Sequence, residues 1–167
     1  MRHKWILSLL VILLPFVSGC NDSDDLDSIF TGKTWKLTYI TIKDKNVMVN
    51  FWGTDSGART KSLEALRASG NFTIKFSGTT TGDIIRGKLN GKAIKSEFSG
   101  DWSANGKTNQ FGSTIGNTSE DDILARKFME GLKTADSYSG DERNLLIYYA
   151  PKDANGQIFS LVFHVVK

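Results

Sequence analysis

The residues that could carry out nucleophilic or metal-dependent chemistry are few in this sequence. His164 is the only histidine after position 3, and Cys20 is the only cysteine. Nucleophilic triads need a histidine beside the nucleophile, and zinc sites need several His or Cys ligands. His164 lies in an apolar segment, where a histidine bonded within a strand is the simplest interpretation. The sequence therefore predicts no catalytic residues of this kind, no metal site and no cofactor.

Paired carboxylates are the remaining catalytic option, because glycoside hydrolysis uses two acids across a cleft. The candidates are Asp83, Glu97 and Asp101. Glu97 and Asp101 are four residues apart in a predicted strand, which separates their backbones by roughly 13 Å. That exceeds the spacing of both usual mechanisms. We expect solvated acids, and a protein that is not an enzyme.

Cys20 ends a segment with a different chemistry. Residues 2–4 are basic or histidine, residues 5–17 are an apolar run, and Val17-Ser18-Gly19-Cys20 follows. The run is too short for a spanning helix, which needs about 20 apolar residues, and is typical of a signal peptide. The last four residues match the lipobox of bacterial lipoproteins. We expect a signal peptide over 1–19, cleavage after Gly19, and acyl chains such as palmitate on Cys20 that hold the chain in a membrane.

The segment after Cys20 is acidic and polar. Residues 21–28 read Asn-Asp-Ser-Asp-Asp-Leu-Asp-Ser, which is typical of a solvated linker. The same pattern resembles the surface-export signals of Bacteroidota lipoproteins. We therefore expect residues 20–30 to be a lipidated cysteine and an acidic tether, on a protein of the outer membrane, with exposure at the cell surface as one option.

Charge gives no indication of a nucleic-acid partner. The chain has 167 residues and a formal net charge of +3. Without Arg2 and Lys4, 19 basic residues face 18 acidic ones, whereas nucleic-acid binding favours a clustered basic face. Arg59, Lys61 and Arg67 are interrupted by Glu64, as on a solvated helix face. The length favours one domain, which we place at 31–167.

Alternation of apolar and polar residues dominates this domain and predicts short strands. In the first of them, Trp35, Leu37 and Tyr39 share one face. Asn90-Gly91 and Asn105-Gly106 are typical of tight hairpin turns, so neighbouring strands should be antiparallel. The predicted strands are Thr34–Ile42, Asn71–Ser77, Asp83–Leu89, Ile94–Trp102, Lys107–Ile115, Asn144–Ala150 and Gln157–Val166.

Two helices interrupt the strand pattern. Asp55 is a suitable N-cap for a helix over 56–68, inside an insert at 43–70. Thr118 or Ser119 would cap a second helix, whose apolar stripe follows a helical period. That stripe comprises Ile123, Leu124, Phe128, Leu132 and Ala135. The predicted fold is mainly β, an α+β protein: a small antiparallel β-barrel of about six to seven strands, with one helix packed before the last two strands.

Short motifs across this region resemble the META/HslJ-like domain family of bacterial envelope proteins. They are Gly32–Leu37, Phe98–Trp102, Ile115–Thr118, Phe128–Leu132 and Ala135–Tyr138. The chain departs from the family by lacking the Gly-Cys-Asn that many members carry before the central strand. The resemblance implies an envelope location, often with a lipid anchor, and no established catalytic chemistry.

Two functions remain open from the sequence. One is a membrane-anchored interaction module that binds an unknown protein or wall component. Phe51 and Trp52 in the insert are its candidate exposed contacts, although burial of both under the insert is the more ordinary interpretation. The other is a lipocalin-like carrier of a small apolar ligand inside the barrel. Large side chains favour the first, because a small barrel lined by them should be solid. These are Trp35, Phe72, Phe76, Phe98, Trp102, Phe111 and Phe163.

Overall fold

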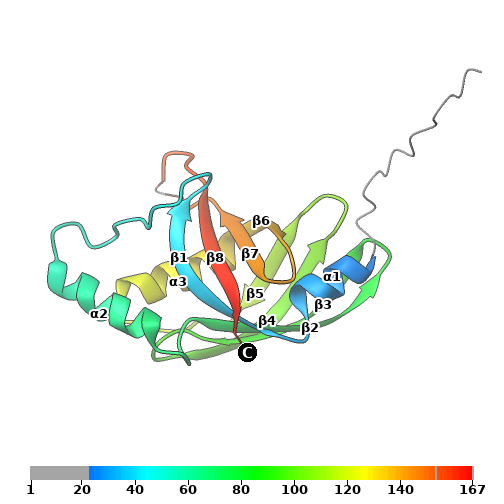
Figure 1. Ribbon diagram of the computed structural model, residues 1–167, viewed down its shortest axis with the longest axis horizontal. Coiled ribbons are helices and arrows are strands. Elements are labelled where there is room, and N and C mark those ends of the chain that lie inside the picture. The colour runs from blue at the N-terminus through cyan, green and yellow to red at the C-terminus, as the bar shows by residue number, and fades with distance from the viewer. Residues whose placement is uncertain (1–22, 153, 167) are drawn as a thin grey trace, which may run out of the picture.

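The alternating segments form a single antiparallel sheet. The computed structural model describes residues 23–152 and 154–166, and within them lie eight strands and three helices (Figure 1). The strands are β1 (Thr34–Ile42), β2 (Thr73–Thr81), β3 (Ile84–Lys92), β4 (Glu97–Asn105), β5 (Phe111–Ile115), β6 (Ala135–Gly140), β7 (Asn144–Tyr149) and β8 (Phe159–Val166). The helices are α1 (Ser23–Phe30), α2 (Ser56–Arg67) and α3 (Ile123–Thr134).

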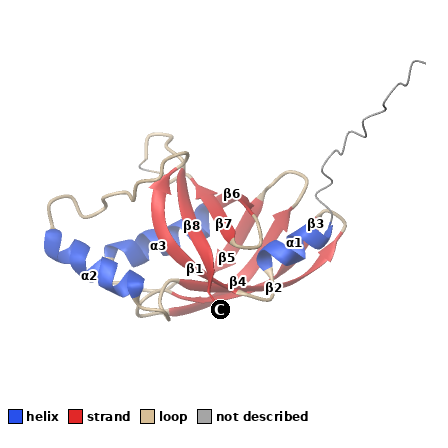
Figure 2. Ribbon diagram, viewed as in Figure 1, coloured by secondary structure: helices blue, strands red, loops and turns tan. Residues whose placement is uncertain are grey.

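The strand order makes the sheet a meander that returns on itself. It runs β5-β4-β3-β2-β1-β8-β7-β6, and every neighbouring pair is antiparallel. The last strand in sequence therefore pairs with the first. The sheet is strongly curved, with α3 crossing its concave side and α1 and α2 at opposite ends (Figure 1, Figure 2). The predicted class, mainly β and antiparallel, is confirmed.

The two outer strands, β5 and β6, approach each other without forming a ladder. One bridge joins Gln110 to Ser137, and the amide of Tyr138 donates to the carbonyl of Asn109 at 2.9 Å. Farther along β5, Ser113 Oγ instead donates to the carbonyl of Leu132, in the last turn of α3, at 2.7 Å. The end of α3 thus occupies part of this edge. The sheet is not closed, so the closed barrel expected from the sequence is not confirmed.

Two phenylalanines, one from each of two helices, fill the concave side. Phe30 of α1 lies 4.7 Å from Trp102 and 4.9 Å from Tyr138, measured between ring centroids. Phe128 of α3 lies 5.5 Å from Phe72 and contacts Phe98 and Phe163 as well. All seven large side chains expected in the interior are buried, which confirms that prediction. Aromatic burial on this scale supplies much of the stability of such a core.

Helix α1 corrects the predicted tether and domain boundary. The segment expected to be a solvated linker is helical from Ser23, and Leu26 and Phe30 are buried in the core. The acidic residues of this segment favour a solvated linker. The same short helix also carries two apolar residues that are four positions apart. That spacing places both on one helical face. The fold therefore begins before residue 31.

Asn90-Gly91 is not a turn, contrary to the prediction. Both residues lie inside β3, and the chain reverses at 93–96, where the amide of Ala93 donates to the carbonyl of Ser96 at 3.0 Å. Gly91 pairs with Phe98 of β4, and a Cβ at Gly91 would lie 2.3 Å from the Phe98 ring. The glycine makes room for an aromatic ring across the strands, as glycines in strands often do.

Both ends of α3 differ from the prediction. Asp122, rather than Thr118 or Ser119, caps the helix by accepting the amide of Ala125 at 3.0 Å. After Thr134 the chain enters β6 directly, so three strands follow the helix instead of two. Strand β6 is not predicted by the sequence pattern, because only Tyr138 among its six residues is buried. Its strand conformation comes from pairing with β7.

Candidate functional site

A groove lies between α2 and the outer face of β1 and β8. It has a volume of about 620 Å³, within the range of small-molecule sites. Met48, Leu63, Leu66 and Val166 supply apolar walls. We call it the α2 groove. Because the insert at 43–70 forms one wall and the sheet forms the other, the position of α2 determines its shape.

The N-terminal half of α2 is fixed by a chain of hydrogen bonds. Asp55 caps the helix by accepting the amide of Ala58 at 2.9 Å, so the predicted cap and helix are confirmed. Ser62, fully buried, accepts from Trp52 Nε1 at 2.8 Å and donates to Asp122 Oδ2 at 2.5 Å. The other oxygen of Asp122 caps α3. One carboxylate therefore ties the insert to the third helix.

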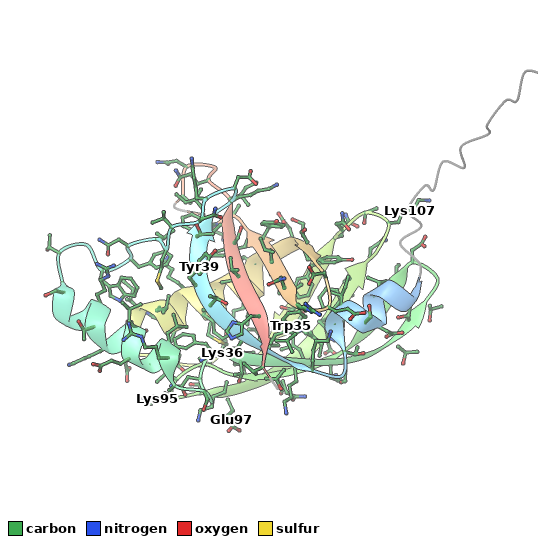
Figure 3. The ribbon with its side chains drawn as sticks, viewed as in Figure 1. Trp35, Lys36, Tyr39, Lys95, Glu97 and Lys107 are labelled. Atoms are coloured by element: carbon green, nitrogen blue, oxygen red, sulfur yellow. The ribbon has the colours of Figure 1, made fainter. Side chains whose placement is uncertain are left out.

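The C-terminal end of α2 rests on a buried lysine. Lys36 Nζ donates to the carbonyls of Ala68 at 2.7 Å and Asn71 at 2.5 Å, and the residue is only 6% exposed. A cation is favourable here, because the last carbonyls of a helix carry partial negative charge. Burial lowers the pKa of the Lys36 ammonium. In Figure 3, Lys36 and Trp35 lie on opposite sides of β1, as successive residues of a strand do.

A β-bulge brings Tyr39 to the groove. The register with β8 shifts between Leu37 and Tyr39, so Tyr39 lines the groove while Ile40 turns into the core. The prediction that Tyr39 shares a face with Trp35 and Leu37 is therefore wrong. A bulge adds a residue to one strand and reverses the faces beyond it.

His164 also borders the groove. Its Nδ1 lies 2.7 Å from Thr38 Oγ1, on the neighbouring strand. The expected strand histidine with a bonded partner is confirmed. Together with Lys36 and Arg67 it places three side chains of basic residues around the apolar walls, and no carboxylate is among the described residues that line the groove. The arrangement can hold an anion at the end of an apolar surface.

The far side of α2 faces a second cleft of about 540 Å³, between α2 and the start of α3. Trp52 and Phe51 both line it, but Trp52 is only 7% exposed. The prediction of an exposed contact at Trp52 is wrong, because its indole is used to hold Ser62. Phe51 is half-buried, and its ring lies 6.2 Å from that of Phe159. Two basic residues, Lys61 and Arg126, and three acidic ones line this cleft, so it has no single charge preference. The acidic residues are Asp55, Asp121 and Asp122.

The candidate carboxylates are not brought together. Asp101 forms an exposed ion pair with Lys88, with 2.5 Å between Nζ and Oδ1. Glu97 is the first residue of β4 and Asn105 is the last. Asp83 lies near Asn105, because its carbonyl accepts a hydrogen bond from the amide of Gly106, so Asp83 and Glu97 are at opposite ends of the strand. Among the described residues, no group of three or more His, Cys, Asp or Glu side chains is arranged to hold a metal ion.

Cys20 and the expected signal peptide lie outside the described residues. No helix within residues 23–152 and 154–166 is long and apolar enough to cross a membrane. Lys36 and Tyr39 are site residues that the sequence does not predict. Alternation alone makes Lys36 an ordinary outward lysine, so no pattern marks it as part of a site. The sequence places Arg67 on a solvated helix face, and the residue is exposed.

The fold and the groove define an antiparallel β-sheet protein with helical insertions and an open surface site. The chain belongs to the DUF4847 family, described as a domain of unknown function, whose model matches residues 21–165. It is also similar to the crystal structure of a DUF4847 family protein from Bacteroides vulgatus, with a TM-score of 0.60 and 24% identity over 83% of this chain and 96% of that one. At this identity the likeness supports the fold alone. No curated protein matches the sequence.

Proposed function

We propose that this chain is a non-catalytic binding module of the bacterial cell envelope that takes up its ligand or partner in the α2 groove. The observation that carries the proposal is the composition of the groove. Apolar walls from α2 and β8 surround Lys36, Arg67 and His164, and no described carboxylate lines the same space. Convergent polar groups on an apolar concave surface are the usual mark of a binding site.

A photo-crosslinker placed in the groove tests this proposal in cells. p-Benzoylphenylalanine at Asn46, which is exposed and lines the groove, is compared with the same residue at Lys88, which is 70% exposed on the outer face of β3. We expect a specific mass increase of the intact protein at position 46 and none at position 88. Equal labelling at both positions, or none at either, would contradict binding in the groove.

The membrane anchor is the second part of the proposal. The lipobox ending in Cys20 supports lipidation, and the acidic residues after it support an outer-membrane lipoprotein that reaches the cell surface. Palmitate labelling of cells that produce wild type or Cys20→Ala tests the anchor. Label should enter only the wild type, which alone should sediment with outer membranes. Cleavage by protease added to intact cells then reports surface exposure, and resistance would place the domain on the inner side.

A lipocalin-like carrier is the alternative function, and one observation favours it. Trp35 Nε1 is buried in the interior without a hydrogen-bond partner among the described residues, and a buried donor of this kind fits a polar ligand atom or a water. Phe30 and Phe128 argue against it, because they occupy the concave side. Native mass spectrometry of purified protein distinguishes the two functions. A co-purifying ligand that survives Arg67→Gln but is lost in Trp35→Phe would favour the carrier.

The barrel belongs to the same set of proposals. The meander order and the Gln110–Ser137 bridge support a barrel completed by β5 and β6. Slow hydrogen exchange of the Tyr138 amide would support closure, and exchange at the rate of an open edge would contradict it.

The motifs at Gly32–Leu37 and Phe98–Trp102 lie in or beside β1 and β4 and support a distant relation to META/HslJ-like domains. The same strand order in a META domain would support that relation, and a different order would oppose it.

A further inference from the structure

The ligand chemistry of the α2 groove follows from the lysine at its base. An ammonium has three N–H donors. Two of those of Lys36 go to the carbonyls of Ala68 and Asn71, and no carboxylate of the described residues forms an ion pair with it. The carbonyls supply only partial charges. A buried cation without a full counter-charge is costly, and an anion bound in the groove would compensate it.

Arg67 strengthens the case for a carboxylate in particular. It lies at the last turn of α2, is exposed and lines the same groove as Lys36. A guanidinium binds a carboxylate through two parallel hydrogen bonds, which a point charge cannot do. Met48, Leu63 and Leu66 form an apolar wall of the groove that suits a methylene chain, while Thr38, Tyr39, Asn46 and Ser69 add uncharged polar groups to its lining.

We propose that the α2 groove binds a small amphiphile with one carboxylate and an apolar chain, such as a medium-chain fatty acid. The carboxylate lies against Lys36 and Arg67, and the chain follows Leu63 and Met48. A volume of about 620 Å³ suits one such molecule and favours it over a folded partner. This proposal rests on the binding function proposed above and names its ligand class.

Three probes and three variants test the proposal by isothermal titration calorimetry. The protein is residues 20–167 with Cys20→Ser, which retains all the described elements and removes the lipid. The probes are decanoate, acetate, and decyltrimethylammonium, each below its micelle concentration. Decanoate should bind saturably, acetate should bind far more weakly, and decyltrimethylammonium should not bind. Added salt should weaken the decanoate complex, because screening reduces the attraction between charges.

The variants separate the groove from the rest of α2. Arg67→Gln should weaken decanoate binding about tenfold or more, as expected for loss of a charged hydrogen bond. Lys61→Gln, on the same helix but in the second cleft, is the matched control and should leave it unchanged. Leu63→Asp should abolish it. Because Arg67 and Lys61 are both exposed, these two variants should fold even where a substitution of Lys36 does not.

Several results would overturn the proposal. One is equal binding of decanoate and decyltrimethylammonium, and another is the same affinity in Arg67→Gln and Lys61→Gln. Binding of a short acidic apolar peptide in place of decanoate would make the occupant a protein segment. Failure of decanoate while the crosslink at position 46 persists would overturn the ligand class and leave the binding function standing. Loss of both would remove the function as well.

Discussion

Substituting Phe30 by alanine tests whether α1 is part of the folded core. The Phe30 ring is fully buried, and its centroid lies 4.7 Å from Trp102, 4.9 Å from Tyr138 and 5.4 Å from Phe76. Removing a buried ring costs the transfer free energy of its atoms and the cavity left behind, about 3–5 kcal/mol in all. Against a total stability of about 5–15 kcal/mol, we expect the variant to be severely destabilised.

Urea unfolding of residues 20–167 with Cys20→Ser, followed by tryptophan fluorescence, measures this cost. With a slope of about 2 kcal/mol per molar urea, the midpoint should fall by about 1.5–2.5 M. Phe51→Ala is the matched control, because Phe51 is half-buried and its nearest ring centroids, those of Trp52 and Phe159, are both 6.2 Å away. Its cost should be less than half as large. A loss below about 1 kcal/mol for Phe30→Ala would refute the reasoning and return the segment to a solvated tether.

Three further perturbations report on other parts of the fold, each measured by urea or thermal unfolding. Glu120→Ala removes a buried carboxylate that accepts the amides of Lys95 and Ser96; we expect a loss of about 1–3 kcal/mol, and little change for exposed Asp121→Ala. Gly91→Val should destabilise strongly, because its Cβ would lie 2.3 Å from the Phe98 ring, and Phe98→Ala should partly relieve that clash. Because burial lowers the pKa of Lys36 below its unfolded value of 10.5, the unfolded chain binds more protons between the two values. Wild-type stability should therefore rise relative to Lys36→Met as the pH increases toward 10.5.

Each of these expectations has a contradicting result. Equal losses for Glu120→Ala and Asp121→Ala would mean that the carboxylate does not hold the turn at 93–96. A well-tolerated Gly91→Val without movement of Phe98 would contradict the packing across β3 and β4. A stability difference between wild type and Lys36→Met that does not change with pH would show that the ammonium is as well solvated in the folded protein as in the unfolded one.

Sequence patterns predicted the structural features that depend on residues close together in the chain. The strand Thr34–Ile42, the Asp55 cap and the buried aromatics follow from alternation and capping, which are local rules. The failures come from tertiary contacts. Asn90-Gly91 has strong turn chemistry, yet the ring of Phe98 requires a glycine opposite it in a strand.

Most of the candidate site could not be predicted from the sequence, because it too depends on tertiary contacts. Lys36 becomes a buried cation only because α2 ends over it, 32 residues later in the chain. Tyr39 reaches the groove through a bulge that alternation cannot indicate. Trp52 looked like a surface contact, and its indole instead holds a serine that is buried between two helices.

The docking of α1 would limit the orientation of a lipidated protein at a membrane. Leu26 is fixed in the core only six residues after Cys20, and six residues span at most about 21 Å. Helix α1 lies at the end of the fold opposite α2 (Figure 1). A lipid on Cys20 would therefore keep the α1 end near the bilayer and leave the α2 groove facing the aqueous side, where it would collect its ligand from solution.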